Sequence, residues 1–448
     1  MSRHHLSRLL LVICAGCALS TVVGGVASAQ LPDTTWVRTF DHDVYSWADW
    51  HRQSFAFPDS QWHWSKIVLR YRIECPSGGC DPWDRLGYLR VETPTDTIEI
   101  ARVVTPFAIP NRSCTWTLDV TDYRPFLHDQ VNLANFISTW IGAPRGWMVT
   151  IDFGFVKGAP LLVPYKVVNL WRSDYAVYGD PARPIESLTL PRDILIDPQA
   201  DAVKFRAIAT GHGQGNTQNC TEFCEKKHMV IANGTQTWHY VWRSDCSSNP
   251  CHPQGGTWQY ARAGWCPGDK VTPWDVDLTT MVTPGQIATL DYNIQDYVNQ
   301  CRPDSACYAN PPGGCTDCDY NSTGHTEPNW AFQTQLVYYK AINPADADQW
   351  DGTIPEGITV LQNSPNPFKP TTWIRYSVER PGAVRLVIYD ASGRAVREIV
   401  REHAAAGAFR ILWDGRNDKG QRVPAGVYFY RMLGAGGESR GERMLLLD

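Results

Sequence analysis

The sequence has few of the features that identify helical, membrane or nucleic-acid-binding proteins. Beyond its first 30 residues, no run reaches the roughly 20 apolar residues that a membrane-spanning helix needs. Long stretches of helical periodicity are scarce, which argues against a mainly helical fold. The 41 Lys and Arg residues are outnumbered by 46 Asp and Glu residues and form no basic stripe. We therefore expect no membrane span and no nucleic-acid partner.

Metal-binding patterns are equally scarce. The cysteine cluster at residues 301–318 contains one C-x-x-C element, but a zinc ribbon needs a second one. A copper monooxygenase would need closely spaced His and Met ligands, whereas His212, His228 and His239 are scattered. We expect neither a metal nor a cofactor, and we interpret these histidines as hydrogen-bonded structural residues.

The first 29 residues have the three-part layout of a secretory signal peptide. Arg3 and Arg8 precede the apolar run LLLVICAGCAL, and the small residues 27–29 form a cleavage site. A lipoprotein cleavage before Cys17 fits the preceding residues less well. Removal of the signal peptide leaves 12 of the 14 cysteines. An even number in an exported chain predicts up to six disulfides.

What the sequence contains in abundance is strand-like alternation. Apolar residues occupy every second position of KIVLRYRIE (residues 66–74) and of GWMVTIDFGF (residues 146–155). Gly, Pro, Asn and Asp separate such segments along the chain. The pattern predicts an all-β protein, and the length favours two or three domains.

The expected domain boundaries fall in two Pro-containing segments. VKGAPLLVP (residues 156–164) separates two β-domains of similar size, and a polar linker begins at Asn343. The predicted organisation is a signal peptide at 1–29, domains at 30–158 and 159–342, a linker at 343–358 and a β-sandwich module at 359–448.

Three cysteine-flanked stretches concentrate charged and aromatic residues. In the first, IECPSGGCDPWDRLGYLRV, Cys75 and Cys80 close a tiny loop that is followed by Trp83, Asp84 and Arg85. Such a loop adds little global stability, because loop-closure entropy grows with loop length. It makes more sense as a clamp that fixes the local backbone, and rigid loops that present charged groups are typical of active sites.

The other two stretches follow the same design. Glu222 lies between Cys220 and Cys224 in NCTEFC, and CSSNPCHPQGGTWQYARAGWCPG carries Arg262 and Trp265. From the residues alone, a hydrolase that uses the two carboxylates and a binding protein are equally good interpretations. The cysteines expected in disulfides here are Cys75, Cys80, Cys220, Cys224, Cys246 and Cys266. The pairing of the remaining six stays open: Cys114, Cys251, Cys301, Cys307, Cys315 and Cys318.

Between Thr35 and Lys340 the chain resembles the peptide-N-glycosidase F family, amidases that remove N-linked glycans from asparagine. The matching strings are ECPSGGCDPWDR, TGHG, NCTEFC, NPCHPQGGTW and ARAGWCPG, in the family's order. The resemblance implies two adjacent eight-stranded jelly rolls with a cleft along their interface. It places Asp84 and Glu222 as catalytic residues that face each other across that cleft.

The resemblance also implies the surroundings of the two carboxylates. Arg85 and Arg262 match arginines that flank the cleft, and we expect them to keep both carboxylates ionised. Ser138 stands where the family's type enzyme has a third acidic residue, while His212 and Phe223 replace tryptophans. The other substrate-binding positions are Trp83, Trp140 and Trp265, which are expected to lie around the cleft.

The C-terminal stretch carries the motifs NPFKPTT, DASGR, WDG and GVYFY. It resembles the sorting or Ig-like modules of bacterial surface proteins, which implies contact with the export machinery and no catalysis. The expected protein is therefore a monomeric, secreted or cell-surface amidase with N-glycoproteins or glycopeptides as substrates. A glycan-binding protein with weakened turnover and a glycosidase remain as alternatives.

Overall fold

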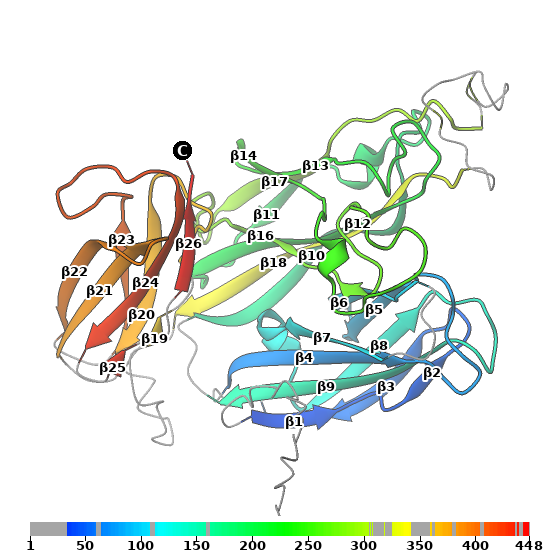
Figure 1. Ribbon diagram of the computed structural model, residues 1–448, viewed down its shortest axis with the longest axis horizontal. Coiled ribbons are helices and arrows are strands. Elements are labelled where there is room, and N and C mark those ends of the chain that lie inside the picture. The colour runs from blue at the N-terminus through cyan, green and yellow to red at the C-terminus, as the bar shows by residue number, and fades with distance from the viewer. Residues whose placement is uncertain are drawn as a thin grey trace, which may run out of the picture. The chain divides into compact units, whose positions relative to one another are not determined.

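The computed structural model describes the chain from residue 34 to residue 447 with gaps (Figure 1). The predicted signal peptide and the linker at 343–358 lie outside the described residues. The described residues are 34–59, 64–107, 113–157, 162–303, 305, 307, 318, 325–341, 359–360, 363–378, 382–403, 407–434, 437–438 and 442–447.

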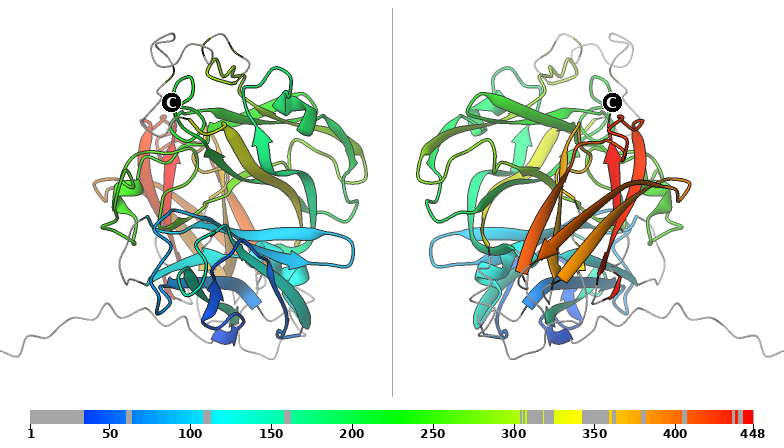
Figure 2. Two further views of the ribbon diagram at one scale, coloured as in Figure 1. Left: turned by 90° about the vertical axis from the view of Figure 1, so that its right-hand side faces the viewer. Right: turned by 90° about the vertical axis from the view of Figure 1, so that its left-hand side faces the viewer.

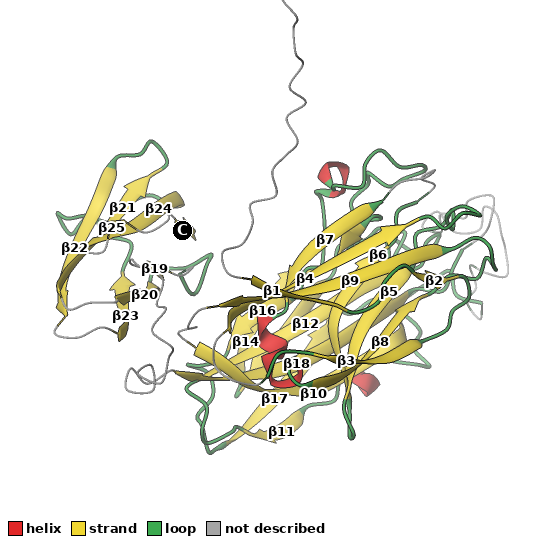
Figure 3. Cartoon of the chain, turned by 90° about the horizontal axis from the view of Figure 1, so that it is seen from below, coloured by secondary structure: helices red, strands yellow, loops and turns green. Residues whose placement is uncertain are grey.

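Strands make up most of the described chain, and the helices are three short 3₁₀ turns (Figure 3). The strands pair antiparallel throughout the sheets. The prediction of an all-β fold is confirmed. Because each sheet buries one face, apolar residues recur at every second position, which is the pattern visible in the sequence.

The first β-sandwich, blue to cyan in Figure 1, has two facing sheets. One has the order β1-β9-β4-β7 with β2 on β9, and the other has the order β15-β6-β5-β8-β3. Its elements are β1 (Thr34–Arg38), β2 (Asp43–Tyr45), β3 (His51–Ala56), β4 (Trp64–Glu74), β5 (Leu86–Glu92), β6 (Thr97–Val104), β7 (Cys114–Asp119), η1 (Thr121–Phe126), β8 (Gln130–Ile137) and β9 (Trp147–Lys157).

The second β-sandwich has four strands in each sheet within the described residues, with the orders β10-β18-β12-β16 and β11-β17-β13-β14. Its elements are β10 (Leu162–Val177), η2 (Ile185–Leu188), β11 (Arg192–Leu195), β12 (Ala202–His212), β13 (Lys227–Ala232), β14 (Thr235–Tyr240), η3 (Cys246–Ser248), β15 (Asp269–Lys270), β16 (Trp274–Asp277), β17 (Ile287–Ile294) and β18 (Asn329–Ala341). The eight strands of these two sheets match the prediction for this domain. In the part of the chain that the structure describes, the first sandwich has nine strands of its own, and β15, which lies between η3 and β16 in the chain, pairs into it.

The C-terminal module is a third β-sandwich, drawn in orange and red in Figure 2. Its sheets have the orders β19-β20-β23 and β22-β21-β24-β25, and β26 pairs with β24. Its strands are β19 (Thr359–Val360), β20 (Thr372–Val378), β21 (Gly382–Asp390), β22 (Ala395–His403), β23 (Gly407–Trp413), β24 (Gly426–Gly434), β25 (Gly437–Glu438) and β26 (Glu442–Leu446).

The core of the first sandwich consists of the alternating apolar residues seen in the sequence. Ile67, Leu69, Tyr71 and Ile73 of β4 are all buried, as are Trp147 and the inward residues that follow it on β9. Val167 of β10 and Val337 of β18 join the same cluster, although they belong to the second sandwich. The two cores therefore meet, and the junction between the sandwiches is itself apolar.

Three further links close this junction. β15, from the second half of the sequence, pairs with β6 and extends a sheet of the first sandwich. A disulfide joins Cys114 on β7 to Cys251, and the Trp116 Nε1–H donates to the Gly268 carbonyl oxygen at 2.9 Å. Groups on either side of the junction are held in a fixed relation by these links.

Replacing Cys114 and Cys251 by Ser should lower the free energy of unfolding. The bond spans 137 positions of sequence, so the chain-entropy model gives a loss of about 5 kcal/mol. Chemical denaturation of the oxidised protein measures this loss.

The matched control replaces Cys75 and Cys80 by Ser. Their separation is 5, and the same model gives a loss of about 2 kcal/mol. If the two double variants lose equal stability, the long disulfide does not tie the two sandwiches together.

Candidate active site

The loop that carries Asp84 is organised around Asp81, a carboxylate with no exposed surface. Asp81 Oδ1 accepts the Trp83 backbone N–H at 3.0 Å, which is an Asx turn. Asp81 Oδ2 accepts the Arg85 Nε–H at 2.8 Å. The Cys75–Cys80 disulfide closes the chain directly before this turn. The residues on both sides of Asp84 are thus fixed by one buried side chain.

Thr105, at the end of β6, fixes the same loop from the other side. Its Oγ1 accepts the Arg85 backbone N–H at 2.8 Å and donates to the Trp83 carbonyl oxygen at 3.2 Å. Asp84 lies between these two anchored residues. Its backbone position therefore follows from the fold of the first sandwich and not from contacts of its own side chain.

Asp81 also connects the loop to the segment after β8. The Thr139 hydroxyl donates to Asp81 Oδ2 at 2.6 Å, and the Ser138 N–H donates to the Leu86 carbonyl oxygen at 2.9 Å. Trp140, the next residue, is 63% exposed. Asp81 therefore holds the Asp84 loop and the Trp140 loop together.

Glu222 lies on the second sandwich, within the loop closed by the Cys220–Cys224 disulfide. Its N–H donates to the Gly213 carbonyl oxygen at 2.9 Å, and its carbonyl oxygen accepts the Ala263 N–H at 2.9 Å. These bonds seat the loop on the end of β12. A Cβ on Gly211 there would lie 2.5 Å from the Thr221 side chain, so the close approach requires glycine.

Arg262 holds the carboxylate of Glu222. Its Nε–H donates to Glu222 Oε1 at 2.9 Å, and its Nη1 donates to the carbonyl oxygens of Thr257 and Tyr260. Its Nη2 donates to Thr257 Oγ1, and the residue is 2% exposed. Arg262 therefore positions Glu222 with most of its donors occupied by protein, and its direct contact with substrate stays a prediction.

The two carboxylates and Arg262 affect one another's charge. Burial raises the pKa of Glu222 to about 7, Arg262 opposes this shift, and the charge of Asp84 adds to it. Burial also raises the pKa of Asp84, with Arg262 and then Arg85 acting in the opposite direction. The structure thus brings Asp84, Glu222 and Arg262 together from two different sandwiches.

These pKa values correct one expectation from the sequence. The two arginines were expected to keep both carboxylates ionised. Burial outweighs their charge at Glu222, because the guanidinium of Arg85 pairs with Asp81 and that of Arg262 is shared among several oxygens. Burial therefore favours the protonated form of Glu222 more than an exposed site would.

The aromatic residues divide into exposed and supporting ones. Trp83 and Trp140 are 56% and 63% exposed, so both can contact a ligand. Trp265 is 3% exposed, and its Nε1–H donates to the Gly211 carbonyl oxygen at 2.8 Å. Because its ring is buried, a sugar cannot stack on it, and the substrate-binding role expected for Trp265 is corrected to support from behind.

His212 and Phe223 are both half-buried and pack against the buried residues of the site. The imidazole of His212 stacks on Trp265 at a centroid distance of 5.2 Å, and burial lowers its pKa to about 3. Phe223 is half-buried, with the Arg262 guanidinium 5.0 Å from its ring centre. Both residues pack on groups that position Glu222.

The other cysteines among the described residues form disulfides as well. Cys246 pairs with Cys266 and Cys301 pairs with Cys318, while Cys307 is also disulfide-bonded. Cys315 lies outside the described residues. The zinc interpretation of this cluster does not apply to disulfide sulfurs. Across the described ranges, no group of three or more His, Cys, Asp and Glu side chains is arranged to hold a metal ion. Nor does any helix there have the length and apolar character for crossing a membrane.

Comparisons with known proteins find relatives of this chain. Residues 184–307 match the family described as Peptide-N-glycosidase F, C terminal. Peptide-N(4)-(N-acetyl-beta-D-glucosaminyl)asparagine amidase F from Elizabethkingia miricola is 28% identical over 302 residues, which cover 63% of this chain and 83% of that protein. The chain is similar to peptide-N-glycosidase F over most of that protein's length.

Solved structures of peptide-N-glycosidase F and of PNGF-II are similar to this fold. Peptide-N-glycosidase F from Flavobacterium meningosepticum gives a TM-score of 0.57 at 23% identity, over 69% of this chain and 97% of that chain. PNGF-II gives a TM-score of 0.50 at 14% identity, over 69% and 66%. The C-terminal module matches the FlgD Ig-like domain at residues 372–437, which agrees with the Ig-like resemblance of its motifs.

Sequence reasoning missed Asp81, Thr105 and Thr139. Asp81 has a local signal, since an Asp that directly follows the closed cysteine loop and lies two residues before Trp83 can form an Asx turn. Thr105 and Thr139 carry no such signal, because they reach the loop through sheet pairing far away in the sequence.

Asp81→Asn should weaken turnover of a glycopeptide more than it weakens the fold. The amide keeps one acceptor oxygen but cannot accept from Trp83, Arg85 and Thr139 together, so Asp84 and Trp140 lose their fixed relation. Misplacement of a reacting group by about 1 Å can cost about a hundredfold in rate. Steady-state kinetics should show kcat/KM falling by this order.

A control variant, Asp193→Asn, changes an exposed aspartate outside this site and should leave kcat/KM unchanged. Asp81→Asn is also expected to lower the melting temperature, because a buried carboxylate is replaced. If the melting temperature falls but kcat and the pH dependence of kcat at low pH stay as in the wild type, Asp81 has no positioning role.

Proposed function

We propose that this chain is a secreted amidase that hydrolyses the bond between N-linked N-acetylglucosamine and asparagine of glycoproteins or glycopeptides. The observation that carries the proposal is the pair Asp84 and Glu222, brought together from two sandwiches beside the exposed Trp83 and Trp140. The kinship with peptide-N-glycosidase F supports the same activity. Two loops that each hold a carboxylate, rigidified by their own disulfides, suit catalysis better than passive binding.

Asp84 is the proposed base. It removes a proton from a water molecule while that water attacks the side-chain amide carbon of the glycosylated asparagine. A carboxylate whose pKa is raised by burial is a stronger base than one in solvent. The C–O bond forms, the carbonyl π-electrons move to the oxygen, and a tetrahedral oxyanion results.

Glu222 is the proposed proton donor to the leaving nitrogen. Its pKa of about 7 keeps much of it protonated near neutral pH, which is the condition for a general acid. Collapse of the oxyanion breaks the C–N bond and transfers the bonding pair to nitrogen. The products are an aspartate-containing peptide and a 1-amino sugar, which later exchanges its amine for water and releases ammonia.

The oxyanion needs a donor, and Arg85 is better placed for this than Arg262. Asp81 engages Nε of Arg85, and Nη2 lies 3.5 Å from Asp81 Oδ1. Within the described residues Nη1 of Arg85 makes no hydrogen bond, and a quarter of the side chain is exposed. A guanidinium N–H aimed at a developing negative charge stabilises it strongly in a water-poor site. No metal or cofactor enters these steps.

The first sugars are proposed to stack on Trp140 and Trp83. Indole faces bind the apolar C–H surfaces of sugar rings, and both rings are more than half exposed. Export by the signal peptide, attachment or sorting through the C-terminal module, and action as a monomer complete the proposal. Ser138 favours the alternative of a glycan-binding protein, since it supplies no third carboxylate.

Turnover in H₂¹⁸O tests the proposal. A denatured glycoprotein incubated with the wild-type protein should yield ¹⁸O-labelled aspartate at former glycosylation sites, because water attacks the amide carbon. Asp84→Asn should lower the rate about a thousandfold or more. Mass spectrometry of the peptides reads both results.

Each other outcome of this experiment has a definite meaning. Intact glycoprotein that is merely retained identifies a binding protein, and a sugar left on asparagine identifies a glycosidase. If Asp84→Asn keeps the wild-type rate, the catalytic role assigned to Asp84 is wrong.

The rate should depend on pH through Glu222. Because burial raises the pKa of this group, its protonated form is favoured in the folded protein, and it is lost as pH rises through about 7. kcat/KM should therefore fall on the alkaline side with an apparent pKa near 7. Glu222→Gln should remove this limb and lower the maximal rate, whereas Glu225→Gln, at an exposed neighbouring position, should change neither. An alkaline limb that persists in Glu222→Gln would show that another group donates the proton.

A further inference from the structure

Two hollows adjoin each other on the side of the second sandwich and at its junction with the first. The smaller, about 250 Å³, lies between β14 and β16, the edge strands of the two sheets in the described residues. The larger, about 660 Å³, reaches β7 of the first sandwich. Trp242, Arg243 and Thr272 line both. We call the combined surface the junction groove.

Aromatic rings and charged side chains line the junction groove, namely those of Trp242, Arg243, Asp245, Asp269, Lys270 and Trp274. None of them belongs to the Asp84–Glu222 site. The catalytic proposal therefore leaves this surface without a role.

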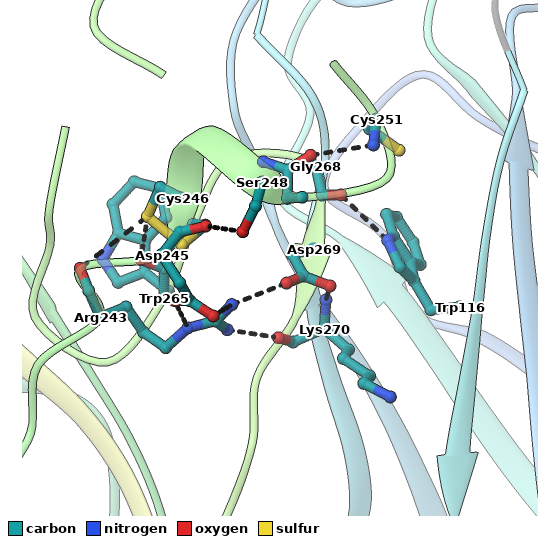
Figure 4. A network of polar contacts seen from close by, with 12 residues as sticks. Trp116, Arg243, Asp245, Cys246, Ser248, Cys251, Trp265, Gly268, Asp269 and Lys270 are labelled. Atoms are coloured by element: carbon teal, nitrogen blue, oxygen red, sulfur yellow. Dashed lines mark hydrogen bonds and ion pairs between the residues drawn. A yellow bond between two sulfur atoms is a disulfide. The ribbon is translucent and has the colours of Figure 1, made fainter. Parts of the chain in front are cut away.

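The polar groups of the groove are held in fixed positions (Figure 4). Arg243 donates from Nε to Asp245 Oδ1 at 2.6 Å and from Nη2 to Asp269 Oδ2 at 2.8 Å. The backbone of Arg243 pairs with that of Arg262, and Cys246 is tied to Cys266. This arrangement presents carboxylate oxygens at fixed positions before any ligand arrives.

Aromatic rings line the groove beside this network. Trp242 and Trp274 are half-buried, and His239 stacks on Trp274 at a centroid distance of 4.5 Å. Tyr240 is 40% exposed. Rings that are fixed on one face and accessible in part can bind the C–H face of a sugar without being ordered first.

His228 is one of the residues that line the smaller hollow. It has no exposed surface, and its Nδ1 is 2.5 Å from the Tyr292 hydroxyl. Its Nε2 has no hydrogen-bond partner among the described residues. A buried polar atom without a partner is rare in folded proteins, and His228 is the fully buried polar side chain that lines this hollow.

A peptide strand fits the groove less well than a saccharide. Strand addition to β7 would need the backbone acceptors of that edge, but Lys270 Nζ already donates to the Thr117 carbonyl oxygen. Hydroxyl groups, in contrast, can donate to Asp245 and Asp269 while these carboxylates keep Arg243. This difference favours a polyhydroxylated ligand.

The charge of the lining indicates which saccharides fit. Three carboxylates (Asp245, Asp269 and Asp275) and two cations (Arg243 and Lys270) line the two hollows. Each cation is already engaged by a carboxylate or a carbonyl oxygen. Arg243 is paired with two of these carboxylates, and the carboxylates outnumber the cations, so an acidic sugar would meet net repulsion.

We propose that the junction groove is a second carbohydrate-binding site, separate from Asp84 and Glu222, that takes neutral oligosaccharides. The inference goes beyond the proposed amidase activity, because it requires binding and no turnover. Such a site would keep a glycoprotein near the enzyme between cleavage events.

The test measures binding of a reduced, neutral high-mannose oligosaccharide to the full wild-type chain by isothermal titration calorimetry. Reduction opens the sugar ring that was joined to asparagine, so the contacts of the catalytic site with that ring are lost. Trp242→Ala should weaken binding about tenfold, as expected for removal of a central aromatic anchor. Trp140→Ala should leave binding unchanged.

Asp245→Ala provides a second variant, because Asp245 is exposed and its removal should not disturb the core. It should also weaken binding, and thermal melting confirms that each variant is folded. A glycan of the same size that carries sialic acids should bind more weakly than the neutral one.

The proposal is overturned if the neutral oligosaccharide does not bind at millimolar concentration, or if Trp242→Ala and Asp245→Ala both bind it as the wild type does. Loss of binding in Trp140→Ala alone would place the ligand at the catalytic site and also overturn it. Asp84→Asn should bind like the wild type, so failure of the amidase proposal and failure of this one give different results.

Discussion

The buried ion pair of Arg102 and Glu99 is the interaction on which the relation of the two sandwiches depends. Arg102 donates to both oxygens of Glu99 at 2.7 and 2.9 Å, and neither side chain is exposed. Its Nη1 donates across the junction to Thr210 Oγ1 at 3.0 Å and to the Ala331 carbonyl oxygen at 2.7 Å. A charge buried this deeply is tolerated only when all its donors are satisfied. The two sandwiches must therefore meet so that Thr210 and Ala331 lie within hydrogen-bond distance of Arg102.

A short series of contacts connects Arg102 to the candidate site. Thr210 also bonds His212, whose ring stacks on Trp265, and Trp265 is anchored by its indole N–H to Gly211. On the same strand end rests the loop of Glu222. Since Asp84 comes from the first sandwich and Glu222 from the second, their mutual electrostatic effect depends on how the two sandwiches meet.

The sequence predicts the fold well because burial of one sheet face leaves a period of two, as in Ile67, Leu69 and Tyr71. It also indicates the two cysteine-closed loops and, through family resemblance, the residues that the structure brings together. It does not reveal that β15 completes a sheet of the first sandwich, because a pairing of two residues has no periodic signal. Nor does it reveal the protonation of Glu222, which depends on burial by residues far away in sequence.

For Asp81, too, the sequence predicts only some of the contacts that the side chain makes. Its neighbours in sequence suggest an Asx turn, whereas its bond to Thr139 depends on the register between β5 and β8. Positioning residues of this kind decide where Asp84 lies without touching a substrate. The conversion of Trp265 from an expected ligand contact to a buried support has the same origin, since only packing decides which face of a ring stays exposed.

The central claim is that Asp84 and Glu222 share one site across the junction. Titration of the Glu222 carboxyl carbon by ¹³C NMR, in the wild type and in Asp84→Asn, measures this directly. The account predicts an apparent pKa of about 7 in the wild type and a lower value in the variant, because the charge of Asp84 contributes to the shift. An ordinary glutamate pKa in the wild type, unchanged in Asp84→Asn, would contradict it.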